Sequence, residues 1–149
     1  LHACGKFISM KNSNECGYTL IMSTEIIGLS HLEREIIANV VRYNIRDFDY
    51  DMMQLETEAG QDLAGVSDRT AITILIAKLT AILRLANSMD KTHKSKLIDC
   101  RMAVREGQLV ITTGYKGDLA LESASFEQKA AFFEEIFGIR PVLKQKRRV

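Results

Sequence analysis

Residues 68–90 constrain the fold more than any other part of the sequence, because they predict one long helix. Apolar residues recur there at spacings of three and four, which is the period of an α-helix. They cover most of the circumference: Ile72, Leu75, Ile76, Leu79, Ile82, Leu83, Leu85 and Ala86. A helix that is apolar on most sides packs inside a bundle, so the segment predicts a mainly α fold with residues 68–90 at its centre.

The polar residues of this helix lie on one stripe. Thr73, Thr80, Arg84, Asn87 and Lys91 follow one another at intervals of seven, four, three and four residues. The stripe is either a narrow strip that faces solvent or the polar lining of a groove. Arg84 interrupts a buried helix, so its charge requires a carboxylate, a carbonyl oxygen or a ligand.

The composition is that of a globular intracellular protein. The chain has 149 residues, of which 46% are hydrophobic and 26% charged, and a net charge of +1, which excludes disordered, collagen-like and coiled-coil chains. Lys78, Thr80 and Arg84 break the longest apolar run, so we expect no helix that crosses a membrane. The first residues do not read as a secretory leader. Widely spaced cysteines without a CxxC pair predict free thiols in the cytoplasm and no structural zinc site.

A second helix is predicted from its capping residues. Ser30 and Glu33 match the S-x-x-E capping box, in which each side chain accepts a hydrogen bond from the backbone N–H of the other residue. The helix that follows is expected from His31 to about Asn44, with one apolar face made of Leu32, Ile36, Ile37, Val40 and Val41.

Three other segments complete the helical part of the chain. Residues 14–23 predict a short helix. Residues 45–67 are acidic and contain glycine breakers, which predicts a long loop with a helical turn. Residues 1–6 read as the end of a helix whose beginning is missing, so we expect an N-terminally truncated piece of a longer protein.

The hydrophobic pattern changes after a basic connector at residues 91–96. Residues 98–104 and 109–113 alternate apolar and polar side chains around a turn at Glu106 and Gly107, which predicts a β-hairpin. Its one buried face would contain Ile98, Cys100, Met102, Val104, Leu109, Ile111 and Thr113.

A helix and a strand are predicted to follow the hairpin. Ser125 and Gln128 resemble a helix start, and Gly138 suits a left-handed C-terminal cap. The core stripe of this helix would contain Phe126, Ala130, Phe133 and Phe137, with Phe132 and Ile136 beside it. Pro141 and the apolar residues after it predict a final edge strand, followed by a basic tail at residues 144–148.

The predicted organisation is a helical domain at residues 1–95 followed by a small β-β-α-β module at residues 96–149. Charge is distributed unevenly along the chain: residues 1–90 have 8 Lys and Arg against 12 Asp and Glu, whereas residues 91–149 have 12 against 7. The basic second part is either a surface for an anionic partner or ordinary variation in surface charge.

Three motifs in this order resemble one known family. Residues 2–6 (HACGK) are similar to the His-Asp–Gly-Lys segment of HD-type helical domains, with Ala3 in place of the aspartate. Residues 28–38 (GLSHLEREIIA) and residues 83–94 (LRLANSMDKTHK) resemble the C-terminal region of the Ppx/GppA phosphatases, the exopolyphosphatases and guanosine pentaphosphate phosphatases. With the β-β-α-β module, the resemblance covers essentially the whole chain.

The resemblance implies an HD-like helical bundle followed by a small α/β module, and a parent hydrolase of the exopolyphosphatase type. In this family, amino-terminal actin-like domains with glycine-rich phosphate loops bind magnesium and hydrolyse the substrate. We therefore expect no catalytic residue and no cofactor in this chain, which would be inactive alone. We also expect it to contact its own actin-like domains within a homodimer.

The resemblance further implies a degenerate HD metal site. An active centre of this type holds a metal with a His, a His–Asp pair and a later Asp. His2 matches the histidine of the pair, but Ala3 cannot ligate, and Asn87 takes the place of the later aspartate. An amide oxygen is a weaker ligand for a hard cation than a carboxylate, so we expect no metal here.

What remains is binding of an anion. The resemblance implies that this region lines a channel for inorganic polyphosphate and contributes to dimer contacts. The candidate contacts are Lys6, Arg42, Arg84, Lys91, His93, Lys94 and Lys96, and the alternative for each of them except Arg84 is a solvated surface charge. One alternative is a degenerate HD regulatory module that senses a guanosine polyphosphate nucleotide. Another is a nucleic-acid binder, which ranks last because residues 91–96 contain no aromatic residue interleaved for base stacking.

Overall fold

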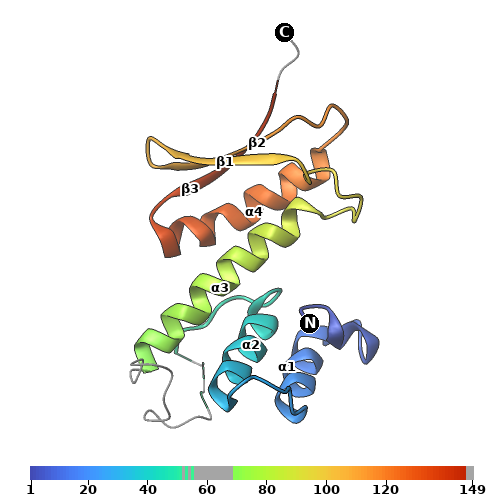
Figure 1. The fold of residues 1–149 in the computed structure, drawn as a ribbon, viewed down its shortest axis with the longest axis vertical. Coiled ribbons are helices and arrows are strands. Elements are labelled where there is room, and N and C mark those ends of the chain that lie inside the picture. The colour runs from blue at the N-terminus through green and yellow to red at the C-terminus, as the bar shows by residue number, and fades with distance from the viewer. Residues whose placement is uncertain (52, 54, 56–68, 147–149) are drawn as a thin grey trace. The chain divides into compact units, whose positions relative to one another are not determined.

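The computed structural model describes residues 1–51, 53, 55 and 69–146, and the chain divides into two compact units, Leu1–Thr80 and Ala81–Val149 (Figure 1). The predicted fold class, mainly α with a small β module, is confirmed. The domain limits predicted from the change of hydrophobic period, 1–95 and 96–149, stay a prediction. Most of the predicted acidic loop at residues 45–67 lies outside the described residues.

The first unit is built around helix α2 (His31–Tyr43), and the predicted helices at residues 14–23 and 31–44 are confirmed. Helix α1 (Ser13–Ser23) packs against α2 in one apolar cluster of Ile21, Ala38 and Val41. A second cluster joins α2 to the first part of helix α3 through Leu32, Ile36, Leu55, Ile72 and Ile76. Helix α2 also buries Glu35 and Asn39, which lie outside its predicted apolar face.

Two local features place the elements of this unit. The capping box is formed as predicted: Glu33 Oε2 accepts a hydrogen bond from Ser30 N–H at 2.8 Å, and Ser30 Oγ accepts one from Glu33 N–H at 3.2 Å. The 3-10 helix η1 (Cys4–Phe7) approaches the start of α1 closely at Gly5. A Cβ on Gly5 would lie 1.7 Å from the Ser13 carbonyl oxygen, so only glycine permits this approach.

Helix α3 (Arg69–Met89) contributes to both units. It places Ile72 and Ile76 in the core of the first unit, and Ala81 and Leu85 in that of the second. The predicted position at the centre of a bundle is wrong, because α3 leaves several apolar residues exposed: Ile74, Leu79 and Ile82. Of the predicted apolar set, Ile72 and Ile76 pack in the first core and Leu85 in the second, whereas Leu79 and Ile82 belong to neither.

One other expectation for α3 is corrected, whereas the expectation that no helix crosses a membrane stays a prediction. Thr80 and Arg84 of the predicted polar stripe are buried, so the stripe is not a continuous strip facing solvent or a groove. By length and composition α3 is also apolar enough to cross a membrane, despite Lys78, Thr80 and Arg84. The core helix of a soluble protein passes the same test.

The second unit contains a three-stranded sheet in the order β1-β2-β3. Strand β1 (Cys100–Arg105) pairs antiparallel with β2 (Gln108–Thr113), and β3 (Arg140–Gln145) pairs parallel with β2. Glu106 and Gly107 have φ of 50° and 73°, the left-handed pair that a two-residue hairpin turn needs. The predicted hairpin and final edge strand are confirmed, but Lys144 and Gln145 belong to β3 rather than to a tail.

Helix α4 (Ala120–Phe137) covers one face of this sheet (Figure 1). Its core stripe is as predicted, with Phe126 and Phe133 packed against Ile111 of β2. Gly138 ends the helix with φ of 68°, also as predicted. The predicted start at Ser125 is wrong. The helix begins at Ala120, where Asp118 Oδ1 accepts a hydrogen bond from Ala120 N–H at 2.8 Å and sets an earlier first turn.

The prediction that β1 has a buried face is also wrong. Met102 and Val104 are 59% and 63% exposed. The register places them opposite Ile111 and Leu109, on the face of the sheet that α4 covers. Ile111 is 1% exposed, so the cover provided by α4 ends at β2 and leaves β1 as an open edge strand. Alternation shows which side chains share a face, but it does not show how far the helix reaches.

Candidate anion-binding site

The connector follows α3 and is held in one shape by Asp90. From here on its name covers residues 90–97, which add Asp90 and Leu97 to the basic stretch 91–96. The Asp90 carboxylate accepts a hydrogen bond from Ser95 N–H at 2.8 Å, and its carbonyl oxygen accepts one from His93 N–H at 3.0 Å. His93 and Ser95 have φ of 52° and 50°, in the left-handed region that costs roughly 1 kcal/mol for a residue other than glycine. The hydrogen bonds to Asp90 offset this cost and keep the turn closed.

A buried carboxylate of α4 anchors the connector. Glu122, in the first turn of α4, is 0% exposed and accepts hydrogen bonds from Thr92 Oγ1 and from Lys96 Nζ, the latter at 3.1 Å. Lys96 Nζ also donates to the Asp118 carbonyl oxygen at 3.0 Å. The hydrogen bond from Thr92 is the main reason why the pKa of Glu122 falls from 4.5 to about 2; Lys96 lowers it further, against the effect of burial. Glu122 is therefore ionised at neutral pH and holds the connector at two points.

The anchor divides the predicted anion contacts of the connector into two kinds. Lys96 is internal, with 13% of its side chain exposed, because it pairs with Glu122. Lys91, His93 and Lys94 are exposed, and none of them forms an ion pair within the part of the chain that the structure describes. Three of the predicted contacts in the connector are therefore exposed to solvent. The fourth, Lys96, holds the backbone of the connector against α4.

Two of the predicted contacts outside the connector are engaged by other protein groups. In the second unit, the Arg84 guanidinium lies 4.6 Å from the centre of the Phe132 ring, which gives the buried charge a cation–π partner. In the first unit, Arg42 pairs with Glu15 at 2.9 Å, and this hydrogen-bonded pair lowers the pKa of the Glu15 carboxyl. Lys6, in η1, is exposed.

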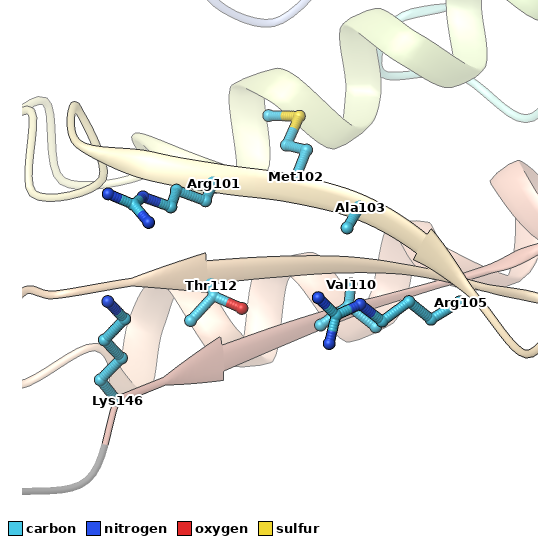
Figure 2. A pocket seen from close by; sticks show the side chains of 7 residues that line it. All are labelled: Arg101, Met102, Ala103, Arg105, Val110, Thr112 and Lys146. Atoms are coloured by element: carbon cyan, nitrogen blue, oxygen red, sulfur yellow. The ribbon is translucent and has the colours of Figure 1, made fainter.

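A further group of cations, which sequence reasoning did not identify, lies on the outer face of the sheet. Arg101, Arg105 and Lys146 surround a hollow of about 190 Å³ (Figure 2), which is also lined by Met102, Ala103, Val110 and Thr112. For Arg101 and Arg105, the alternation of side chains along the predicted strand already indicates a shared face. The alternation that places Met102 and Val104 on one face of β1 must place Arg101 and Arg105 together on the other.

A family model described as Ppx/GppA phosphatase, domain III, matches residues 1–130. The chain belongs to the Ppx/GppA phosphatase family. The match reaches from η1 into α4, so the family resemblance of residues 28–38 and 83–94 is confirmed, and with it the assignment to the C-terminal region of such a phosphatase. A search of curated proteins finds no match to the chain.

The three residues predicted to form a degenerate HD site in this Ppx/GppA domain carry few ligand atoms. His2 is exposed, Ala3 has no ligating side-chain atom, and Asn87 is half-buried and offers only an amide. Within residues 1–51, 53, 55 and 69–146, no three His, Cys, Asp or Glu side chains gather in a group that could hold a metal ion. Among the predicted site residues, Lys6 of η1 and the connector residues Lys91, His93 and Lys94 are exposed.

Proposed function

We propose that this Ppx/GppA domain binds inorganic polyphosphate through the connector and does not itself hydrolyse it. The observation that carries the proposal is the anchored turn, in which Glu122 fixes Lys96 while Lys91, His93 and Lys94 are exposed. Polyphosphate has about one negative charge per phosphate, so lysines exposed on one turn can bind it without reading a sequence. Membership of the Ppx/GppA family supports this choice of anion.

The proposal assigns hydrolysis to the actin-like amino-terminal domains of a cytoplasmic parent enzyme, with magnesium bound in those domains. It assigns this domain to a homodimer in which it lengthens the path for the substrate. The resemblance to the family supports this division of roles. Sedimentation of the 149-residue chain tests the dimer, because a chain that stays monomeric at high micromolar concentration would contradict it.

The chemistry of the connector favours polyphosphate over a guanosine polyphosphate nucleotide or a nucleic acid. Residues 90–97 contain no Phe, Tyr or Trp that could stack on a base. Thermal unfolding in the presence of each ligand separates the alternatives. Stabilisation by guanosine pentaphosphate but not by polyphosphate would replace our proposal with a nucleotide sensor.

The decisive experiment measures binding of long-chain polyphosphate at a series of salt concentrations. Each cation that contacts a single-stranded polyanion contributes about 0.7 to the slope of log K against log salt concentration. We therefore expect the Lys91→Gln/Lys94→Gln variant to bind more weakly and to reduce that slope by about 1.4. The matched control, Lys78→Gln/Lys116→Gln, removes the same charge from two exposed lysines outside the connector. Equal losses in both variants would refute a site at the connector.

A further inference from the structure

The free edge of β1 is a feature of the second unit that polyphosphate binding does not use. Strand β1 lies at one end of the order β1-β2-β3 and pairs with β2 through six consecutive residues, with no bulge. No other strand pairs with β1 among the described residues. An edge strand of this kind presents unpaired backbone N–H and C=O groups to any segment that can align with it.

The hydrogen bonds of β2 show which residues present these groups. The Thr113 carbonyl oxygen accepts a hydrogen bond from Lys146 N–H at 3.0 Å, so the odd-numbered residues of β2 bond to β3. The even-numbered residues of β2 therefore bond to β1, through their register partners Arg105, Ala103 and Arg101. The backbone groups of Met102 and Val104 consequently point away from β2, along the free edge.

The two faces of β1 differ in chemistry. Met102 and Val104 form an exposed apolar pair on the α4 side, beyond the reach of that helix. Arg101 and Arg105 lie on the other face, on either side of Ala103, and Figure 2 shows Met102 pointing to the opposite side of the strand from Ala103. Neither arginine forms an ion pair within the described residues. A strand laid beside β1 would place alternate side chains against the apolar pair and against the arginine pair.

We propose that β1 binds an extended segment of a partner protein by strand addition, and that this segment has the pattern acidic–apolar–any–apolar–acidic. Its acidic side chains pair with Arg101 and Arg105, its apolar side chains pack on Met102 and Val104, and its backbone bonds to the free edge. Charge complementarity selects an acidic segment, and the apolar pair and the open edge select a peptide over polyphosphate. The site is separate from the connector and does not rest on the proposed function.

The chain contains a stretch of this pattern, residues 47–51 (DFDYD), but the structure argues against it as the occupant. The ring centroid of Phe48 lies 4.8 Å from that of Tyr43 and 4.8 Å from that of Tyr50. Phe48 also packs against the core cluster that joins α2 and α3 in the first unit. Docking this stretch on β1 would return the Phe48 ring to solvent or leave a gap in that core, so a separate partner is favoured.

The test uses the 149-residue chain and a fluorescent peptide of sequence TEVTVET, with TKVTVKT as the charge-reversed control. We expect the first peptide to bind at least about tenfold more tightly than the control, since it alone pairs with both arginines. At saturation, hydrogen exchange of the Met102 and Val104 amides should slow by at least about tenfold, because both gain acceptors. Binding without protection of these two amides would overturn strand addition.

Two variants test the edge and the arginine face separately. Met102→Pro removes a free-edge N–H and leaves the ladder to β2 in place, so it should abolish binding of TEVTVET. If circular dichroism shows that this variant does not fold, the Arg101→Glu/Arg105→Glu variant tests the proposal instead. It should bind TKVTVKT and no longer bind TEVTVET. An unchanged peptide preference would overturn the proposal. So would a dimer of the unliganded chain that Met102→Pro dissociates, since a second copy would then occupy β1.

Discussion

Replacing Glu122 with glutamine tests the anchor of the connector most directly. Glutamine keeps nearly the same shape and an oxygen that can accept from Thr92, but it removes the negative charge 3.1 Å from the Lys96 ammonium. In the folded protein the pKa of Glu122 is about 2, against an ordinary value of 4.5. The stabilisation therefore belongs to the ionised carboxylate, and the glutamine variant lacks it.

The magnitude follows from the linkage between pKa and stability. A fall from 4.5 to about 2 corresponds to at most about 3 kcal/mol in the free energy of unfolding at pH 7. Because the folded-state pKa is the lower one, this contribution is complete above about pH 5 and is lost as the pH falls towards 2. Less than half of this contribution should remain at pH 3, so the difference between the unmodified chain and Glu122→Gln should narrow by about 2 kcal/mol between pH 7 and pH 3.

Urea unfolding followed by circular dichroism at a series of pH values measures this difference. The matched control is Glu127→Gln in the same helix, where the carboxylate pairs with Arg140 but 64% of its side chain is exposed. That variant should cost less than about 1 kcal/mol at any pH, because exposed ion pairs contribute little. A deficit of Glu122→Gln that stays constant from pH 7 to pH 3 would show that the buried carboxylate does not titrate as the anchor requires.

Three further predictions concern the framework. Gly5→Ala should lower the free energy of unfolding by about 3 kcal/mol or prevent folding, because its Cβ would lie 1.7 Å from the Ser13 carbonyl oxygen; Gly114→Ala, with no atom within 4 Å of its Cβ, is the near-neutral control in the same urea titration. Ser30→Ala should cost about 1 kcal/mol, since it removes the acceptor for the N–H at the third position of α2, and an unchanged unfolding midpoint would contradict the cap. Gly138→Ala should cost about 1 kcal/mol, because its φ of 68° is unfavourable for alanine; a stabilised variant in thermal unfolding would contradict that geometry.

Elements that depend on neighbouring residues could be predicted from the sequence. The Ser30–Glu33 box marks the start of α2 because both partners are three residues apart and act within one turn. Glu106 and Gly107 mark the hairpin for the same reason, since a two-residue turn depends on the φ that those two positions adopt. Gly138 marks the end of α4, because a left-handed cap is a property of one residue.

Features that depend on distant residues could not be predicted. Glu122 appears in the sequence as one carboxylate among many, and only the folded chain brings Thr92 and Lys96 to it, from 30 and 26 residues away. The start of α4 was missed because its first turn is held by these contacts and by Asp118 rather than by a residue pattern at Ser125.

The candidate cations show the same limit. Arg42 was predicted as an anion contact from its charge alone, but its partner Glu15 lies 27 residues earlier. Arg84 was expected to need a carboxylate, a carbonyl oxygen or a ligand, and the structure places the Phe132 ring, 48 positions later in the numbering, under its guanidinium. The sequence shows which residues are charged. Whether a charge is internal or exposed depends on its contacts with residues far away in the sequence, which only the folded structure shows.

The two surfaces proposed for the second unit depend on different parts of it. The connector is shaped by the first turn of α4, through Glu122, so loss of that carboxylate should weaken polyphosphate binding. The β1 edge depends on the ladder to β2, which involves neither the connector nor α4. Glu122→Gln should therefore leave peptide binding at β1 unchanged, and Met102→Pro should leave polyphosphate binding unchanged. Because each surface retains its own support when the other is removed, a single variant that abolished both activities would indicate unfolding of the unit rather than loss of a site.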